Sequence, residues 1–264
     1  MDNFLVVSQY KGALVLAFLL TFFVLGRLIP FSKISQAQAR IANNLALSGF
    51  NAVLAVLIVM PVAVSASHWT YEWRPDSLQG LTGLIVNLVL LDLWIYWWHR
   101  TEHAVPFLWR FHEVHHLDET LDATSALRFH FGEVFISSLV RLPIIMLLAI
   151  PFEHIVLFET MVAMAAIFHH SNLRLPQYFE RALSWFIVTP SIHWVHHHAI
   201  REDTDSNYAV FFSIWDRLFF SQSRTIRRAD LVIGVEGRSD QSFIKLLFWP
   251  IRNSNGGSGS LRKT

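Results

Sequence analysis

Cysteine is absent from the 264 residues of the chain. This absence excludes disulfide bonds, thiolate zinc sites and iron–sulfur clusters ligated by the chain itself, so any bound metal must take nitrogen or oxygen ligands. Charge is also scarce, because only 16% of the residues are charged, the formal net charge is +1 and no dense run of lysine and arginine occurs. The chain therefore lacks the basic surface typical of nucleic-acid-binding proteins, and we expect no nucleic-acid partner.

Apolar residues are abundant and make up 53% of the chain. This share exceeds the range of ordinary globular domains and indicates a protein that lies in a membrane. Apolar stretches at residues 12–26, 45–66 and 78–98 predict three spanning helices, the third of which contains a single carboxylate, Asp92. Residues 134–168 are again apolar and predict a hairpin or a re-entrant pair of helices.

Prolines and charges set the expected limits of these segments. The second stretch, residues 45–66, has no charge and ends near Pro61. Four residues break the last stretch: Arg141, Pro151, Glu153 and Glu159. These breaks favour two short helices that turn back within the membrane.

The orientation of the helices follows from the charges of the loops. The segment after the first helix carries Arg27, Lys33 and Arg40 without an acidic residue, which predicts a cytoplasmic location. Counting from there, the loop around residues 69–76 lies outside, and the hairpin leaves the cytoplasmic side and returns to it. Every histidine cluster then lies on the cytoplasmic face of a multi-pass integral membrane protein.

The sequence thus predicts an all-α membrane bundle with a helical cap on its cytoplasmic face. We expect N-terminal membrane helices in residues 1–80 and a histidine-rich region with the hairpin in residues 81–220. Residues 221–264 are expected to form a basic tail that lies on the membrane surface. The tail ends in a glycine- and serine-rich stretch at residues 253–260, which is expected to be flexible.

Histidine is the anomaly, because most of the 14 residues fall in short clusters. "HRTEH" places His99 and His103 one helical turn apart on the same face. "HEVHH" and "HWVHH" share the spacing i, i+3, i+4 and contain His112, His115, His116, His193, His196 and His197. Eight imidazoles exceed the three or four that one zinc ion takes, so the sequence predicts two metal ions.

Other histidines are weaker candidates for the same site. "FHHSN" offers His169, His170 and Asn172 at the end of the hairpin, and His130 and His198 are additional candidates. An isolated histidine in an apolar stretch is more often a hydrogen-bonded core residue, and we expect this of His68 and His154. In the clusters, each unsatisfied buried imidazole would cost about 1 to 3 kcal/mol, which favours metal ligation.

Carboxylates near the clusters are candidates for holding the imidazoles in place. Asp92 lies seven residues before His99, two helical turns along the same face, and is predicted to accept the outer N–H of a ligand imidazole. Glu102, Glu113 and Glu133 either do the same or face solvent. An all-nitrogen site suits iron, zinc or copper, and the residue types do not select one of them.

The chain resembles the fatty acid hydroxylase and sterol desaturase superfamily of membrane oxygenases. The resemblance rests on "DLWIYWWHRTEH", "LWRFHEVHH", "TSALRFHFGE", "HHSN", "TPSIHWVHHH" and "DSNYAVFFSIWDRLF", in this order, over roughly residues 85 to 220. It implies a helical membrane fold with two iron ions at the cytoplasmic face, a site that zinc can also occupy in isolated protein. It also implies oxygen-dependent hydroxylation or desaturation of a lipid such as a fatty acyl chain or a sterol.

The resemblance also assigns residues. It implies that the eight clustered histidines are ligands, with His130 and His170 as additions, and that Arg128 and Asn207 support the site. The chain departs from the family pattern at Phe220 and Ser221, where a glycine–threonine pair is common, and such departures affect loop shape rather than ligands.

Electrons for such a reaction must come from a separate donor protein. The sequence has no glycine-rich dinucleotide fingerprint, no cysteine for a cluster and no evident haem-binding segment. The competing hypothesis is a non-catalytic metal-binding or metal-transport protein, whose ligands should lie at membrane depth. The clusters here lie at helix ends on one side, which favours the enzyme.

Overall fold

The computed structural model describes residues 2–33, 38–68 and 75–252. The predicted flexible end at residues 253–260 and most of the predicted outer loop at residues 69–76 lie outside these ranges. Within the described residues the structure is helical, and β-pairing is limited to three isolated bridges. The prediction of an all-α protein is therefore confirmed for this part of the chain.

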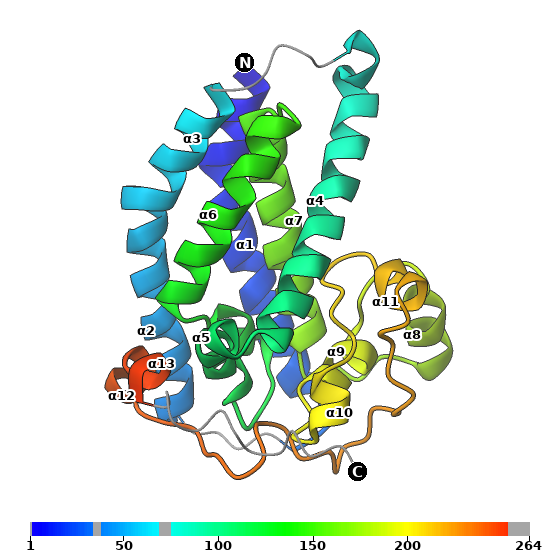
Figure 1. Ribbon diagram of the computed structural model, residues 1–264. Helices are drawn as coiled ribbons and strands as arrows, with labels where there is room; N and C mark the ends of the chain where they lie inside the picture. The colour runs from blue at the N-terminus through cyan, green and yellow to red at the C-terminus, as the bar shows by residue number, and fades with distance from the viewer. Residues whose placement is uncertain (1, 34–37, 69–74, 253–264) are drawn as a thin grey trace.

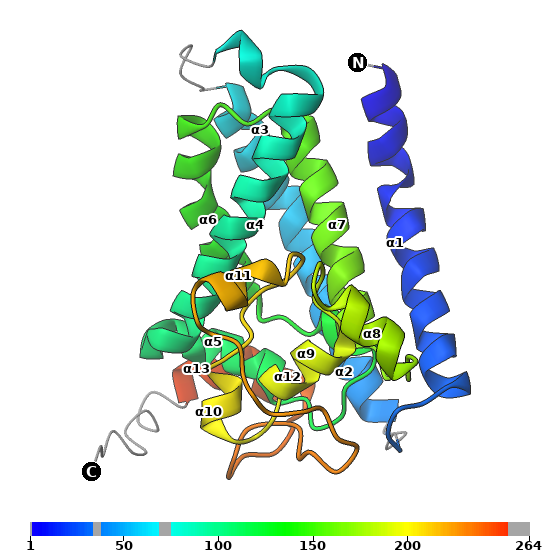
Figure 2. The same cartoon turned by 90° about the vertical axis from the view of Figure 1, so that its right-hand side faces the viewer.

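Long helices run side by side and form the upper body of the molecule (Figures 1 and 2). Their bounds are α1 Asp2–Leu28, α2 Gln38–Leu54, η1 Ala55–Val59, α3 Met60–His68, α4 Gly80–Ala104, α6 Phe131–Leu147 and α7 Phe152–His170. Among the described residues, four continuous helical stretches are long and apolar enough to cross a membrane: Tyr10–Leu28, Gln38–Ala66, Gly80–Ala104 and Phe152–His170. The predicted helices are all present, and most extend beyond the apolar runs that predicted them.

The second stretch runs past Pro61 and ends close to the predicted bound at residue 66, so the proline does not end the helix. The chain remains helical from α2 to His68, with one wide π-helical turn, η1, immediately before the proline. The amide of Met60 bonds to the carbonyl of Ala55 across this turn. Pro61 has no amide hydrogen, and its ring would clash with a carbonyl in a regular α-helix, so the wider turn accommodates it without ending the helix.

The predicted hairpin is present, but the charged residues do not break it. Helices α6 and α7 meet at a short turn, and Arg141 and Glu159 lie inside them. Glu159 accepts from Arg141 at 2.8 Å and from Lys11 of α1 at 3.0 Å. The charges are thus paired with one another and connect α1, α6 and α7.

Two of the basic residues that set the predicted orientation are held by carboxylates of the cap. Arg40 is buried in α2 and bonds to Asp118 at 2.9 Å and Asp122 at 2.5 Å, and Arg27 at the end of α1 lies 3.4 Å from Asp122. These ion pairs attach α1 and α2 to the cap. The cytoplasmic orientation remains a prediction.

The cap consists of short helices gathered at the lower ends of α1, α4 and α7 (Figure 1). They are α5 Pro106–His116, η3 Ala123–Leu127, α8 Gln177–Leu183, α9 Pro190–His196, α10 Arg201–Thr204, α11 Ile214–Leu218, α12 Phe243–Leu247 and α13 Trp249–Arg252. A further short helix, η2 Asp76–Leu78, precedes α4 at the other end of the molecule. All of the predicted histidine clusters lie at the capped end.

An apolar core joins α4 to the hairpin. Leu91 of α4 packs against Ile145, Ile150 and Phe158, and all four side chains are almost completely buried. On the same helix, Leu81 is 71% exposed, as expected of a side chain that faces lipid. The core therefore fixes the position of α4, which carries the first histidine pair.

Replacing Leu91 with alanine should lower stability, because it leaves a cavity that the packed helices cannot fill, at a cost of about 2 to 5 kcal/mol. The matched control is Leu81→Ala on the exposed face of α4, which should change stability little. Thermal unfolding of both variants in the same detergent measures the difference. Equal melting temperatures would contradict the packing described here.

Candidate metal centre

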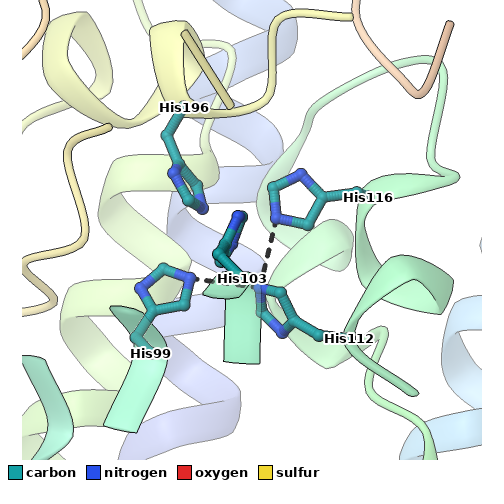
Figure 3. A group of neighbouring side chains, drawn as sticks. All are labelled: His99, His103, His112, His116 and His196. Carbon is teal, nitrogen blue, oxygen red and sulfur yellow. Dashed lines mark hydrogen bonds between the residues drawn. The ribbon is translucent and has the colours of Figure 1, made fainter. Parts of the chain in front are cut away.

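Nine buried histidines form two groups at the capped end of the molecule. We call the first group site A; it contains His99, His103, His112, His116 and His196. The second group, site B, contains His115, His170, His193 and His197. In each group, one ring nitrogen of every histidine lies within 4.8 Å of those of the others, and Figure 3 shows the five rings of site A facing a common space.

The geometry of the α-helix explains how the clusters HEVHH and HWVHH, which we call the histidine boxes, each contribute ligands to both groups. Successive residues of a helix are rotated by about 100°, so residues i and i+4 point nearly the same way while residue i+3 diverges. In α5, His112 and His116 accordingly enter site A while His115 enters site B. In α9 and the residue after it, His193 and His197 enter site B while His196 enters site A. The two sites are neighbours that share both boxes.

The spacing of the nitrogens fits metal coordination. In site A, the Nε2 atoms of His99 and His116 lie 3.1 Å from Nε2 of His112. In site B, Nε2 of His170 lies 3.0 Å from that of His193 and 3.1 Å from that of His115. Ligands on one tetrahedral ion with bonds near 2.0 Å are about 3.3 Å apart, close to these distances.

Backbone carbonyl partners fix which nitrogen carries the proton in three of these rings. The Nδ1 atoms of His99, His115 and His170 face backbone carbonyl oxygens at 2.8, 3.0 and 2.7 Å. A carbonyl oxygen only accepts, so Nδ1 carries the proton in each ring and Nε2 presents a lone pair. The Nε2 lone pairs of His115 and His170 face each other at 3.1 Å and repel, and a cation between them turns the repulsion into coordination.

Burial keeps the imidazoles in the form that binds metal. It lowers the pKa of His112 to about 3, and together with neighbouring imidazoles it holds the pKa values of His116 and His197 well below their usual range. The rings are therefore neutral at physiological pH. In addition, Nε2 of His103 and Nε2 of His196 are buried and have no protein partner. These observations fit a metal ion in site A.

A short backbone segment positions two histidines of site A. The carbonyls of Ser206 and Tyr208 accept from Nδ1 of His196 at 2.7 Å and of His99 at 2.8 Å. Asn207 lies between them with φ +53, a left-handed conformation that asparagine tolerates. Its side chain bonds to the carbonyl of Ile192 and to the amide of Ser223. Asn207 thus holds both carbonyls toward the histidines, and its own side chain bonds to the backbone rather than to the rings.

The structure distinguishes the three glutamates that the sequence left undecided. Glu133 accepts from Nδ1 of His112 at 2.8 Å, and Glu102 lies 3.8 Å from the same atom. Both carboxyls are buried. Glu113 instead bonds to Arg238 and Trp249. Site A therefore has two carboxyl groups behind one of its imidazoles.

Arg128 supports site B through its backbone and its side chain. Its carbonyl accepts from His115, as described above, and its buried guanidinium bonds to the carbonyl of Val114, to Asn44 and to Asp240. These contacts fix Arg128 between α2 and α5. The supporting position that the resemblance implied for Arg128 agrees with this geometry.

Several candidates from the sequence lie outside both groups. His130 accepts from the amide of Gly132 and bonds through Nε2 to the carbonyl of Leu247, so both of its nitrogens are used. His198 bonds to Asp203 at 2.7 Å. His169 is buried beside His193, with ring centroids 3.9 Å apart. The structure does not bring these three residues into either group.

Asn172 connects the centre to the chain that leaves α1. Its side-chain amide bonds to the carbonyl of Ser32, and its side-chain oxygen accepts from the amide of the same residue. Because His170 of site B is two residues away, this contact fixes the end of α7. Asn172 acts on the backbone rather than on an imidazole.

The predicted role of Asp92 was wrong. Its Oδ2 accepts from the amide of Phe212 at 3.0 Å and from the indole nitrogen of Trp215 at 2.7 Å, not from an imidazole. Two helical turns place Asp92 on the face of His99 but about 10 Å away along the axis, beyond hydrogen-bonding reach. The side chain anchors the segment around α11 to α4.

The part of the chain that is similar to known proteins is the part that contains these histidines. A model of the fatty acid hydroxylase family matches residues 84–221, just over half of the chain. The chain belongs to the fatty acid hydroxylase family. The match contains all the histidines of sites A and B, and the resemblance inferred from the motifs is confirmed.

Similar proteins are named for different lipids. The ornithine lipid hydroxylase OlsE of Rhizobium tropici is 26% identical over 85% of this chain and 70% of its own length. A cholesterol 25-hydroxylase-like protein of Danio rerio is 29% identical over 71% of this chain and 74% of its own. An alkylglycerol monooxygenase of Xenopus tropicalis is 32% identical over 49% of this chain, which spans only 28% of that relative. No solved structure gives a significant match.

Replacing His112 or His196 with alanine should lower the metal content, because each change removes a nitrogen from site A. The matched control is His154→Gln, because His154 lies near the far end of α7 and outside both groups. Elemental analysis of protein purified under identical conditions measures the bound metal. Unchanged metal content in the two alanine variants would contradict site A.

Replacing Glu133 with alanine should weaken metal binding at site A about 10- to 100-fold, because His112 loses the group that orients it. Glu133→Gln should retain more affinity, since the amide oxygen still accepts from Nδ1. Metal competition with a chelator measures both variants. An alanine variant that binds as tightly as the parent protein would show that Glu133 does not position His112.

Proposed function

We propose that this protein is a membrane enzyme that hydroxylates a lipid with dioxygen, using two iron ions held in sites A and B. The observation that carries the proposal is the convergence of nine neutral, buried imidazoles into two adjacent groups. Ring centroids of His116 in site A and His197 in site B lie only 4.4 Å apart, which supports a paired centre. Membership of the fatty acid hydroxylase family supports the reaction class.

The overall reaction replaces a C–H bond with a C–OH bond. One atom of dioxygen enters the lipid and the other leaves as water, which requires two electrons and two protons. Iron ions bound in the two sites would supply the activation of dioxygen that attack on an unactivated carbon requires. The protein supplies the nitrogen ligands, fixes their orientation through Nδ1 and excludes bulk water from the buried sites.

Electrons would come from a separate donor protein. The described residues hold no cysteine, and the sequence has no dinucleotide fingerprint. The orientation predicted from the basic loop residues puts the cap on the cytoplasmic face, where such a donor would meet it.

The substrate is proposed to be a lipid that enters from the bilayer. The names of the relatives include ornithine lipids, alkylglycerols and cholesterol, each of which has an aliphatic part and a polar part. Apolar side chains cover the outer faces of the long helices, as contact with lipid requires. Desaturation would share the initial hydrogen abstraction, and the names of the relatives favour hydroxylation.

Metal transport is the weaker hypothesis. A transporter needs ligands at several depths across the membrane. Here the histidines of sites A and B gather at one end of α4 and α7 and in the cap. At membrane depth, the Lys11, Arg141 and Glu159 cluster contains one carboxylate that is already paired with two cations.

The test is turnover with isotopically labelled dioxygen. Purified protein loaded with iron is supplied with a reductant and total membrane lipid, and the lipids are analysed by mass spectrometry. We expect labelled oxygen in a hydroxylated lipid, no product from His112→Ala or His196→Ala, and full activity from His154→Gln. Metal-loaded protein that forms no labelled product would count against hydroxylation, while leaving the metal sites intact.

A further inference from the structure

Two cap segments expose an unusual concentration of large apolar side chains. Residues 177–186, with α8, and residues 211–220, with α11, lie together on one side of the cap, and we call them the flange (Figure 1). Phe220 is 95% exposed, Tyr178 81% and Trp185 64%. The other strongly exposed apolar side chains of the flange are Phe179, Phe186, Ile214 and Leu218. A surface of this kind marks an interaction site.

The two segments are joined into one unit by backbone hydrogen bonds. The amide of Val188 donates to the carbonyl of Phe211 at 2.9 Å, and the amide of Ser213 donates to the carbonyl of Phe186 at 3.2 Å. The hydroxyl of Ser213 also bonds to the carbonyl of Ser184 at 2.7 Å. Such internal pairing of backbone groups is what an apolar environment demands.

The contact with α4 places the flange at membrane depth. Asp92 accepts from Phe212 and Trp215 of the flange. It lies at the middle of the candidate span Gly80–Ala104 and about 10 Å deeper than His99. A segment that touches a spanning helix at its middle lies beside the acyl layer rather than in water.

The apolar surface of the flange continues the outer face of α4. Trp97 of α4 is 44% exposed, and its ring lies 4.8 Å from that of Phe219. Tryptophan and tyrosine are enriched where protein meets the membrane interface. The two surfaces therefore face the same medium.

The charges of the flange fit anionic headgroups. Arg181 is exposed, and Arg217 lies over the ring of Trp185 at 5.0 Å. Neither acidic residue of the flange is free: Glu180 accepts from the amide of Ser191, and Asp216 is buried. The accessible charge on this surface is thus positive.

The backbone conformation of Phe220 also favours contact of the flange with lipid. Phe220 has φ +56, a left-handed conformation that is unfavourable for a non-glycine residue. The strain turns a large apolar side chain away from the protein, which is unfavourable in water. Transfer of the side chain into lipid offsets this cost.

We propose that the flange inserts into the bilayer leaflet beside α4, with its aromatic side chains in the interface and upper acyl layer and its arginines at the phosphates. The occupant of this surface is the membrane that the long helices cross. The proposal does not depend on the metal or on the reaction. It concerns only where the cap lies relative to the bilayer.

The absence of cysteine allows a direct test. Single variants Phe186→Cys and Leu218→Cys carry a nitroxide on the flange, and Leu20→Cys carries one on the exposed face of α1 as a lipid-facing reference. Ile226→Cys is the matched control, because Ile226 is an apolar residue that is 76% exposed but lies in the segment after the flange. All are reconstituted in vesicles of phosphatidylcholine and phosphatidylglycerol, and melting temperatures check that each variant folds.

Collision of the nitroxide with oxygen and with a water-soluble nickel chelate separates the outcomes. We expect labels at 186 and 218 to favour oxygen, as the label at 20 does, and the label at 226 to favour nickel. Preference for nickel at 186 and 218 would put the flange in water and overturn the proposal. Low access to both reagents would show a protein contact, such as a second copy of the chain, and would also overturn it.

Discussion

The mutual repulsion of imidazole lone pairs is the constraint on which the centre depends. Backbone carbonyls hold the proton of His99, His115 and His170 on Nδ1, which forces each Nε2 to face its neighbours as an acceptor. Without cations, these acceptors would be buried with nothing to bond. This unfavourable arrangement is maintained by the backbone carbonyls, the ion pairs of Arg40 and the contacts of Arg128. Metal binding and the final packing of the cap are therefore coupled.

The helices supply ligands to sites A and B, and their electrostatic field also favours cations there. Sites A and B draw on the last turns of α4, α5, α7 and α9, so four helix C-termini converge on the centre. The C-terminal end of a helix carries a partial negative charge, and each is worth about 0.3 to 1 kcal/mol to a nearby cation. The buried carboxyl groups of Glu133 and Glu102 lie on one side only, behind His112. The surroundings of the two sites therefore differ although both contain imidazoles alone.

The pattern of side chains in the sequence predicted the features that depend on helical periodicity. It missed the features that depend on the conformation of the backbone. The long helices and the histidine boxes follow from apolar runs and from the i, i+4 spacing, and both were predicted. The division of each box between two sites follows from the same rotation per residue but required the positions of α5 and α9. The carbonyls of Ser206 and Tyr208 have no side-chain signal, and only the family resemblance pointed to Asn207 between them. For His130 the family resemblance implied a metal ligand. In the structure its side chain instead bonds to Gly132 and Leu247, outside both groups.

Asp92 links the metal centre to the membrane in an unexpected way. A carboxylate at the middle of a spanning helix costs about 2.5 to 3.5 kcal/mol on insertion scales, so a stabilising partner is required. An imidazole near the helix end is out of reach, whereas the flange brings an amide and an indole N–H to it. If the flange lies in the bilayer, these bonds are formed in an apolar medium, where each is stronger than in water. The loop of Ser206 to Tyr208 precedes the flange directly, so the same anchor that fixes the flange against α4 also fixes the carbonyls that orient His99 and His196. Contact with lipid and orientation of the ligands would then depend on one short stretch of chain.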